Sequence, residues 1–215
     1  MKILVLSGPN HGFDKSAAVI GDFLGQQANL QVTVSDDKAL LTAPELNEYA
    51  VCVFGTGFTR GTLQQDGTVK REPDLTPDQE AGLFRFVESG KGLVGIHGTA
   101  WWIGGRAVDL IGGHANWHPP GLTFTVNIAD ANHPVTAGVS DFAVEDEIYI
   151  SAYEPTLHIL ASAQWHGRAH PMAWVKHFGQ GRVFYTTLGH TADTFRQPAM
   201  QQLVTQGVRW VGAQG

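Results

Sequence analysis

The sequence predicts an α/β fold whose sheet is mostly parallel, with some antiparallel strands in the C-terminal half. Over the first hundred residues, apolar runs too short for helices alternate with helical patterns, which is typical of βαβ units with right-handed crossovers. After Pro120, runs of alternating polarity follow one another, as in half-exposed antiparallel strands. The chain has 215 residues, 43% of them hydrophobic, which is enough for one sizeable core. We therefore expect a single domain over residues 1–215.

The N-terminal half is expected to supply the parallel strands, at residues 2–6, 30–35, 50–54 and 92–96. A helix is expected at residues 16–27, with Asp14 as its N-cap. The stretch Thr76-Pro77-Asp78-Gln79 predicts a helix start with a capping box, and the helix should continue to about Ser89. Residues 58–74 are predicted to form a long polar loop of the kind that serves as a lid or a binding loop.

The C-terminal half is expected to begin with a Trp-rich, helix-like segment that ends at Ile111. Strand-like patterns follow at residues 122–128, 142–150, 157–163, 172–178 and 182–188. Residues 196–211 carry apolar side chains at helical spacing and are predicted to form the closing helix.

Composition excludes several classes of function. A formal charge of −6 disfavours nucleic acid or an anionic membrane as the main partner, because both require a basic surface. No run of 18 apolar residues and no signal sequence is present, so we expect a cytoplasmic protein. The single cysteine, Cys52, rules out an internal disulfide and lies in an apolar run, which favours a core residue over a nucleophile.

Three predicted strands are each followed by a histidine: His11, His97 and His190. The carboxyl ends of parallel strands meet at one edge of a sheet, so these side chains could share one crevice. His114 and His118 follow the helix-like segment and could fold back to the same edge. The alternative is that each histidine only caps its own turn by hydrogen bonding.

The densest acidic cluster is Glu145-Asp146-Glu147, inside a strand-like run. Side chains alternate along a strand, so Glu145 and Glu147 should share one face, opposite Asp146. Either the cluster is a solvated edge, or some of its acids point toward the histidines. A carboxylate beside imidazoles suits acid–base chemistry, because each group shifts the pKa of the other. Asp146 takes the catalytic place of Glu147 if the register is shifted by one residue.

Histidines and carboxylates could also bind a divalent metal such as zinc, although no HExxH motif or cysteine pair is present. If a metal is bound, the expected ligands are His97, His114 and His190. Trp101 and Trp117 flank the same stretch. They are either core residues or platforms for sugar rings, which stack on aromatic side chains.

Five sequence motifs resemble the trehalose-utilisation, or ThuA-like, family within the class I glutamine amidotransferase-like superfamily. They are GLVGIHG around His97, IGGHANWHP around His114, NHPVTAG around His133, EDEIY at 145–149 and GQGRVFYTTLGH ending at His190. The resemblance implies a flavodoxin-like three-layer α/β/α sandwich. It also implies a role in disaccharide or glucoside catabolism, often alongside sugar dehydrogenases that make 3-keto derivatives.

The chain departs from the wider superfamily at the strand-to-helix elbow. Amidotransferases place a cysteine there, whereas this chain reads Gly95-Ile96-His97-Gly98, so glutamine hydrolysis through a thiolate is excluded. We expect an enzyme that cleaves a 3-keto-glycoside, with His97 and Glu147 as the acid–base pair and His190 also in the catalytic site. His11, His114, Trp101, Trp117 and His118 are expected to bind the substrate.

Two other functions remain open from the sequence. One is a non-catalytic sugar-binding accessory protein, and the other is a metal-dependent sugar hydrolase or isomerase. In each case the expected partner is a small-molecule sugar, and a homo-oligomer is left open.

Overall fold

The computed structural model describes residues 1–55, 57–102 and 106–213. Within them, nine strands form one sheet in the order β2-β1-β3-β6-β13-β12-β11-β8-β9. The parallel half contains β2 (Gln31–Ser35), β1 (Lys2–Leu6), β3 (Val51–Phe54), β6 (Gly92–Ile96) and β13 (Gly181–Thr186). The antiparallel half contains β12 (Arg168–Phe178), β11 (His158–Trp165), β8 (Leu122–Ile128) and β9 (Phe142–Asp146). The predicted change of strand direction in the C-terminal half is confirmed.

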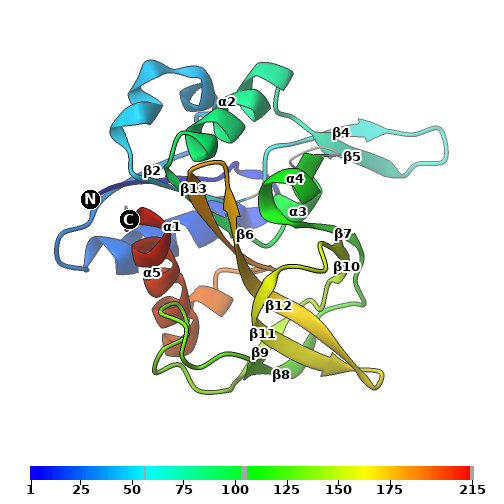
Figure 1. Cartoon of the computed structure of the whole chain (residues 1–215). Coiled ribbons are helices and arrows are strands. Elements are labelled where there is room, and N and C mark those ends of the chain that lie inside the picture. The colour runs from blue at the N-terminus through cyan, green and yellow to red at the C-terminus, as the bar shows by residue number, and fades with distance from the viewer. Residues whose placement is uncertain (56, 103–105, 214–215) are drawn as a thin grey trace.

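Helices cover both faces of the sheet and make a three-layer sandwich (Figure 1). Alternate residues of β1 point to opposite faces, with Ile3 and Val5 in one apolar cluster and Leu4 and Leu6 in the other. One face packs against α1 (Phe13–Gly25) and α5 (Pro198–Gly212). The other face packs against α2 (Pro77–Glu88), α3 (Thr99–Trp102), α4 (Ala107–Ile111) and the 3-10 turns η2 (Lys38–Thr42) and η3 (Pro44–Glu48).

The predicted capping box fixes the start of α2. The backbone N–H of Gln79 donates to Oγ1 of Thr76 over 3.3 Å, and the backbone N–H of Thr76 donates to Oε1 of Gln79 over 2.9 Å. The start of α1 differs from the prediction: Gly12, with a left-handed φ of 75°, is the N-cap, and Asp14 lies in the first turn. No helix among the described residues is long and apolar enough to cross a membrane.

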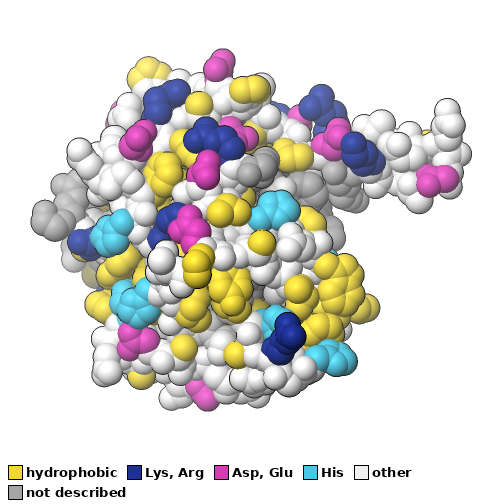
Figure 2. Space-filling model, turned by 45° about the vertical axis from the view of Figure 1, so that its right-hand side comes forward, with side chains coloured by type: hydrophobic (Ala, Val, Ile, Leu, Met, Phe, Trp, Pro, Cys, Tyr) yellow, Lys and Arg dark blue, Asp and Glu magenta, His cyan; other side chains and the backbone are white. Residues whose placement is uncertain are grey.

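The predicted long polar loop at residues 58–74 is instead a β-hairpin of β4 (Thr59–Leu63) and β5 (Val69–Pro73). Its turn is closed by the backbone N–H of Gln64, which donates to the carbonyl of Thr68 over 2.7 Å. The hairpin projects from the body of the molecule in Figures 1 and 2. Most of β4 is exposed to solvent, so its side chains are polar without the apolar alternation that marks a half-buried strand.

The predicted strand at residues 142–150 is divided. Its first part is β9, which ends at Asp146, and its last residue begins β10 (Ile150–Tyr153). The β10 strand pairs antiparallel with β7 (Gly113–Trp117). The segment Glu147–Tyr149 is therefore a link between two sheets, and the strand alternation does not extend through it.

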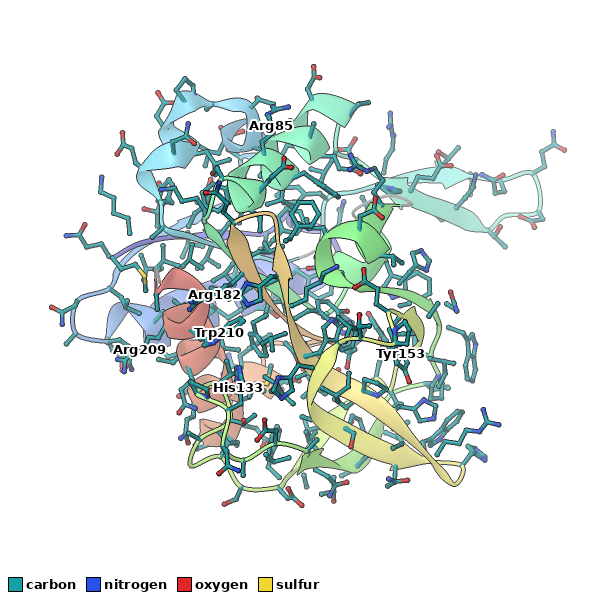
Figure 3. The ribbon with its side chains drawn as sticks, in the orientation of Figure 1. Arg85, His133, Tyr153, Arg182, Arg209 and Trp210 are labelled. Carbon is teal, nitrogen blue, oxygen red and sulfur yellow. The ribbon has the colours of Figure 1, made fainter. Side chains whose placement is uncertain are left out.

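Different contacts occur at the two ends of the parallel strands. At the carboxyl edge of the parallel strands, Ile96 at the end of β6 pairs with Thr186 at the end of β13. At the opposite edge, the guanidinium of Arg182 lies 5.3 Å from the ring centre of Trp210 and joins β13 to α5 (Figure 3). The histidines that follow β6 and β13 are therefore brought together at the carboxyl edge.

Candidate functional site

His97 lies at a strained turn directly after β6. Its φ of 44° is left-handed, a conformation that non-glycine residues rarely adopt and that costs on the order of 1–3 kcal/mol. Two hydrogen bonds hold the turn: the His97 N–H donates to the Thr186 carbonyl over 2.7 Å, and the Tyr185 hydroxyl donates to the His97 carbonyl over 2.6 Å. The imidazole is thereby fixed at the carboxyl edge of the sheet.

The His97 ring is 2% exposed, and its tautomer is set by its neighbours. Nδ1 lies 2.6 Å from the carbonyl oxygen of Thr187, which can only accept, so Nδ1 carries a hydrogen. Nε2 lies 2.8 Å from the hydroxyl of Tyr149, which donates to it when the ring is neutral. His97 therefore presents the basic nitrogen Nε2 to the other side chains of the site.

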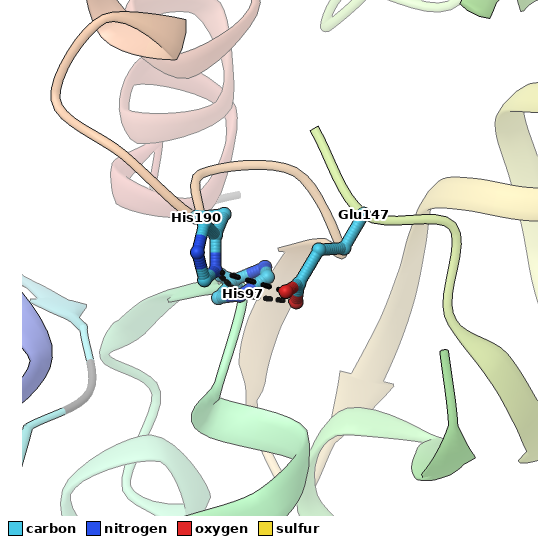
Figure 4. Close-up of side chains that lie close together, drawn as sticks. All are labelled: His97, Glu147 and His190. Carbon is cyan, nitrogen blue, oxygen red and sulfur yellow. Dashed lines mark hydrogen bonds and ion pairs between the residues drawn. The ribbon is translucent and has the colours of Figure 1, made fainter. Parts of the chain in front are cut away.

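Glu147 joins three histidines from different parts of the chain. Its Oε2 lies 3.4 Å from Nε2 of His97, and its Oε1 lies 3.3 Å from Nδ1 of His190 (Figure 4). The same Oε1 lies 3.4 Å from Nδ1 of His118. His97 and Glu147 are buried, while His118 and His190 are partly exposed and connect the site to solvent.

Glu147 and His190 each shift the pKa of the other toward its charged form. Burial alone raises the pKa of the Glu147 carboxyl, but hydrogen bonds from His190 and from the protonated form of His97 outweigh burial and hold that pKa well below its usual range. The hydrogen bond to Glu147 raises the pKa of His190 above its ordinary value of 6.5, although burial partly opposes the rise. Glu147 is therefore ionised at neutral pH, and protonation of His190 is favoured.

Asp146 is buried next to Glu147, but its carboxylate serves the backbone. It accepts hydrogen bonds from the N–H groups of Gly189 (2.8 Å) and His190 (3.2 Å) and from the hydroxyl of Thr194 (2.7 Å). The backbone N–H of Glu147 also donates to it over 2.8 Å. These bonds suit Asp146 to hold the loop that carries His190 in position, rather than to replace Glu147 as a catalytic base.

The acidic cluster divides differently from the predicted alternation. Glu145 is exposed, whereas Asp146 and Glu147 are both buried. The reason is that β9 ends at Asp146, so the next residue is free to turn toward His97. The prediction that Glu145 and Glu147 share a face is wrong.

Tyr149 is a site residue that the sequence analysis did not single out. Its ring centre lies 4.6 Å from that of His97, 5.7 Å from His118 and 5.9 Å from Trp101. Burial raises the pKa of its hydroxyl well above the usual value, so the hydroxyl remains a hydrogen-bond donor. The available signal was its position in the EDEIY motif, two residues after Glu147.

The remaining predicted substrate-binding residues lie farther out. Trp101 lies with its ring centre 6.3 Å from those of both His114 and His118. His114 lies on β7, where its Nδ1 is 3.3 Å from Oδ1 of Asn116. Trp117 is 53% exposed at the end of the same strand. His11 lies in the 3-10 turn η1 (Asn10–Gly12), and its side chain is outside the described part of the structure.

Within the described residues, one group of side chains could hold a metal ion: His97, Glu147 and His190, whose ligand atoms lie within 4.8 Å of one another. The third possible ligand is thus Glu147, whereas the sequence analysis expected His114. The Nδ1–H of His97 donates to a carbonyl, an arrangement that is common for a metal-binding histidine.

The Glu147 carboxylate lies close to both imidazoles through different oxygens. Nε2 of His97 is 3.4 Å from Oε2 of Glu147 and from Nδ1 of His190, and Oε1 of Glu147 is 3.3 Å from Nδ1 of His190. The two imidazoles and the carboxylate are therefore close enough to bind one metal ion together.

Comparisons with known proteins agree with this fold. A family model named ThuA, described as trehalose utilisation, matches residues 2–211. A putative ThuA-like protein from Parabacteroides merdae superposes with a TM-score of 0.78 at 16% identity, covering 99% of this chain and 90% of that one. A putative ThuA-like protein from Bacteroides uniformis gives a TM-score of 0.77 at 19% identity, covering 98% and 91%.

A more distant similarity extends to part of a larger enzyme. A β-galactosidase from Bacillus circulans sp. alkalophilus gives a TM-score of 0.65 at 14% identity, covering 99% of this chain and 31% of the enzyme. At these identities the similarity establishes a shared fold. No curated protein sequence matches the chain.

Proposed function

The chain belongs to the ThuA (trehalose utilisation) family, and from this premise we propose that it cleaves the glycosidic bond of a 3-keto-glycoside such as 3-keto-trehalose by acid–base chemistry. One observation carries the proposal. A basic imidazole nitrogen, a carboxylate and a second imidazole lie 3.3–3.4 Å apart at the carboxyl edge of the sheet. This edge is where ligands bind in open α/β folds.

The chemistry requires one base and one acid. A carbonyl at C3 acidifies the C2–H bond, and loss of that proton leaves an enolate over C2, C3 and the carbonyl oxygen. When the carbonyl re-forms, the electron pair makes a C1–C2 double bond and the C1–O bond to the leaving sugar breaks. The leaving oxygen then takes a proton. Water can afterwards add across the double bond to give the free 3-keto sugar.

We assign these roles to particular groups on the basis of their contacts. We assign His97 as the base, because its Nδ1–H is fixed by the Thr187 carbonyl and its Nε2 faces the site. The acid is assigned to the Glu147–His190 pair, in which the hydrogen bond to Glu147 raises the pKa of His190 and so favours its protonated form. The Tyr149 hydroxyl, which donates to Nε2 of neutral His97, is assigned to donate to the enolate oxygen once Nε2 has taken the proton.

Turnover of a defined substrate tests the proposal. Purified protein is incubated with 3-keto-trehalose, and released glucose is measured over time. We expect release by the wild-type protein and a rate lower by about 10²–10⁴-fold in His97→Ala. Glu145→Gln is the matched control, because Glu145 is the exposed neighbour of the site acids and should leave the rate unchanged.

A metal-dependent hydrolase or isomerase is the second candidate function. It is favoured by the group of His97, Glu147 and His190, whose ligand atoms lie within 4.8 Å of one another and whose imidazole and carboxylate donors are ones that zinc binds. A bound ion would polarise the keto oxygen of the sugar. Metal analysis of the purified protein, followed by activity with chelator and after zinc is restored, separates this candidate from metal-free acid–base cleavage.

The non-catalytic sugar-binding protein predicts a different pair of results. Trehalose or its keto derivative would raise the melting temperature of the protein, and no product would form with any tested glycoside. Measuring thermal unfolding and turnover on the same preparation decides between binding alone and catalysis.

A further inference from the structure

Two tryptophan side chains lie beside one another near the candidate site, and we name them the aromatic shelf: Trp117 and Trp165. Trp117 is 53% exposed and Trp165 is partly buried. The ring centres of Trp117 and Trp165 lie 6.0 Å apart with a tilt of 42°. In the view of Figure 2, hydrophobic side chains gather at the lower right of the molecule, beside histidine and basic side chains. Large aromatics exposed in this way usually mark a binding surface.

The aromatic shelf lies on the same edge of the sheet as the candidate site. Because β12 runs antiparallel to β13, the tip of the β11–β12 hairpin extends beyond the carboxyl end of β13. Trp165 is the last residue of β11 and is therefore at that tip. Two further links connect Trp117 to the site: His118 follows it in the chain, and its strand partner Ile150 follows Tyr149.

Hydrogen-bonding side chains flank the aromatic shelf. Arg168 pairs directly with Trp165 across the hairpin and is exposed. His170 shares that face, and its ring centre lies 6.0 Å from the ring centre of Trp165. The hairpin turn has left-handed φ values of 48° at His166 and 72° at Gly167, which fits the twist of the strands and holds the tip in place.

We propose that the aromatic shelf binds the second ring of a disaccharide while the first, oxidised ring occupies the site at His97. This inference rests on the proposed function and adds a second subsite, which binds the sugar that leaves. The apolar face of a pyranose stacks on Trp117 and Trp165, and its hydroxyls bond to Arg168 and His170. Aromatic faces that are bordered by hydrogen-bond donors and that adjoin the candidate site suit a sugar ring.

The test compares two substrates in three variants. For each protein, kcat/KM is measured with 3-keto-trehalose and with the 3-keto derivative of methyl α-glucoside, which lacks the second ring. We divide kcat/KM for 3-keto-trehalose by kcat/KM for the methyl glucoside derivative. This ratio should fall about two- to tenfold in Trp117→Ala and in Trp165→Phe, since each change removes or weakens one stacking contact. Trp210→Phe is the control, because Trp210 lies on α5 against Arg182, at the opposite end of β13 from the candidate site.

Binding is measured separately with unoxidised sugars. Trehalose should quench the tryptophan emission of the wild type more strongly than methyl α-glucoside does, and Trp117→Ala should remove most of the difference. If no keto-glycoside turns over but this quenching pattern holds, the aromatic shelf stands and the proposed function fails. If turnover is found but the substrate ratio does not change, the proposed function stands and the shelf is wrong. Loss of a dimer in Trp117→Ala, with an unchanged ratio, would assign the surface to a second copy and overturn the inference.

Discussion

The Nε2 atom of His97 lies 3.4 Å from Oε2 of Glu147, although the two residues come from separate parts of the fold. His97 follows β6 in the parallel half of the sheet, and Glu147 follows β9 at the antiparallel end of the sheet. The contact forms only because the link Glu147–Tyr149 crosses the carboxyl edge between β9 and β10. The site therefore depends on the complete sheet.

Metal binding should identify the ligands. We expect His97→Ala, Glu147→Gln and His190→Ala each to weaken zinc binding by more than about tenfold, since changes beyond the direct ligands already cost ~10–100-fold. His114→Ala is the control, because His114 lies outside the group. Isothermal titration with zinc measures the affinities. An equal loss in His114→Ala would contradict the geometry.

Removal of the Asp146 carboxylate should loosen the loop that carries His190. In Asp146→Ala, the buried donors of Gly189 and Thr194 lose their acceptor, and we expect the free energy of unfolding to fall by about 2–3 kcal/mol. Urea denaturation measures the loss. Glu145→Gln, at the exposed neighbouring position, should change stability by less than about 0.5 kcal/mol. A similar loss in both variants would show that the carboxylate of Asp146 has no special role.

The charge of His190 should set the alkaline limit of activity. Its pKa is raised above 6.5 by Glu147, so the protonated form persists to a higher pH than in a free imidazole and is lost as the pH rises through the raised value. Proton binding by His190 therefore stabilises the fold below pH 6.5, and this stabilisation disappears at higher pH. NMR titration of His190 in the wild type and in Glu147→Gln measures the shift. The pKa should fall in the variant, and an unchanged pKa would remove Glu147 as its cause.

Cys52 should be inert. It is fully buried in the middle of β3, and burial raises the pKa of its thiol to about 12. We expect no reaction with a thiol reagent in the native protein and full reaction after denaturation. Cys52→Ala should retain turnover of 3-keto-trehalose. A variant that folds but has lost turnover would implicate the thiol in chemistry and contradict the assignment to the core.

Local signals were sufficient for the main elements of the fold. The capping box at Thr76 located the start of α2 because its two hydrogen bonds lie within four residues. The β4–β5 hairpin was missed because both of its faces are largely exposed, so polarity does not alternate along it. The start of α1 was also misplaced, since Gly12 caps the helix through its backbone conformation, without a side-chain bond.

The site could be predicted only in part, for physical reasons that differ between residues. His97 and His190 follow adjacent parallel strands, and this relation was expressed by their positions after two apolar runs. The role of Asp146 depends on hydrogen bonds to Gly189 and Thr194, which no local pattern indicates. Likewise, Glu147 turns toward His97 because β9 ends at Asp146. Strict strand alternation instead predicted that Glu147 shares a face with Glu145.

The central claim is that His97 and Glu147 act together on a keto sugar. The direct measurement is glucose release from 3-keto-trehalose by the wild type, His97→Ala, Glu147→Gln and the double variant. We expect each single variant to lose about 10²–10⁴-fold in rate, and the double variant to be little worse than either, because the two groups act as a unit. Wild-type turnover that persists in folded His97→Ala would contradict the account.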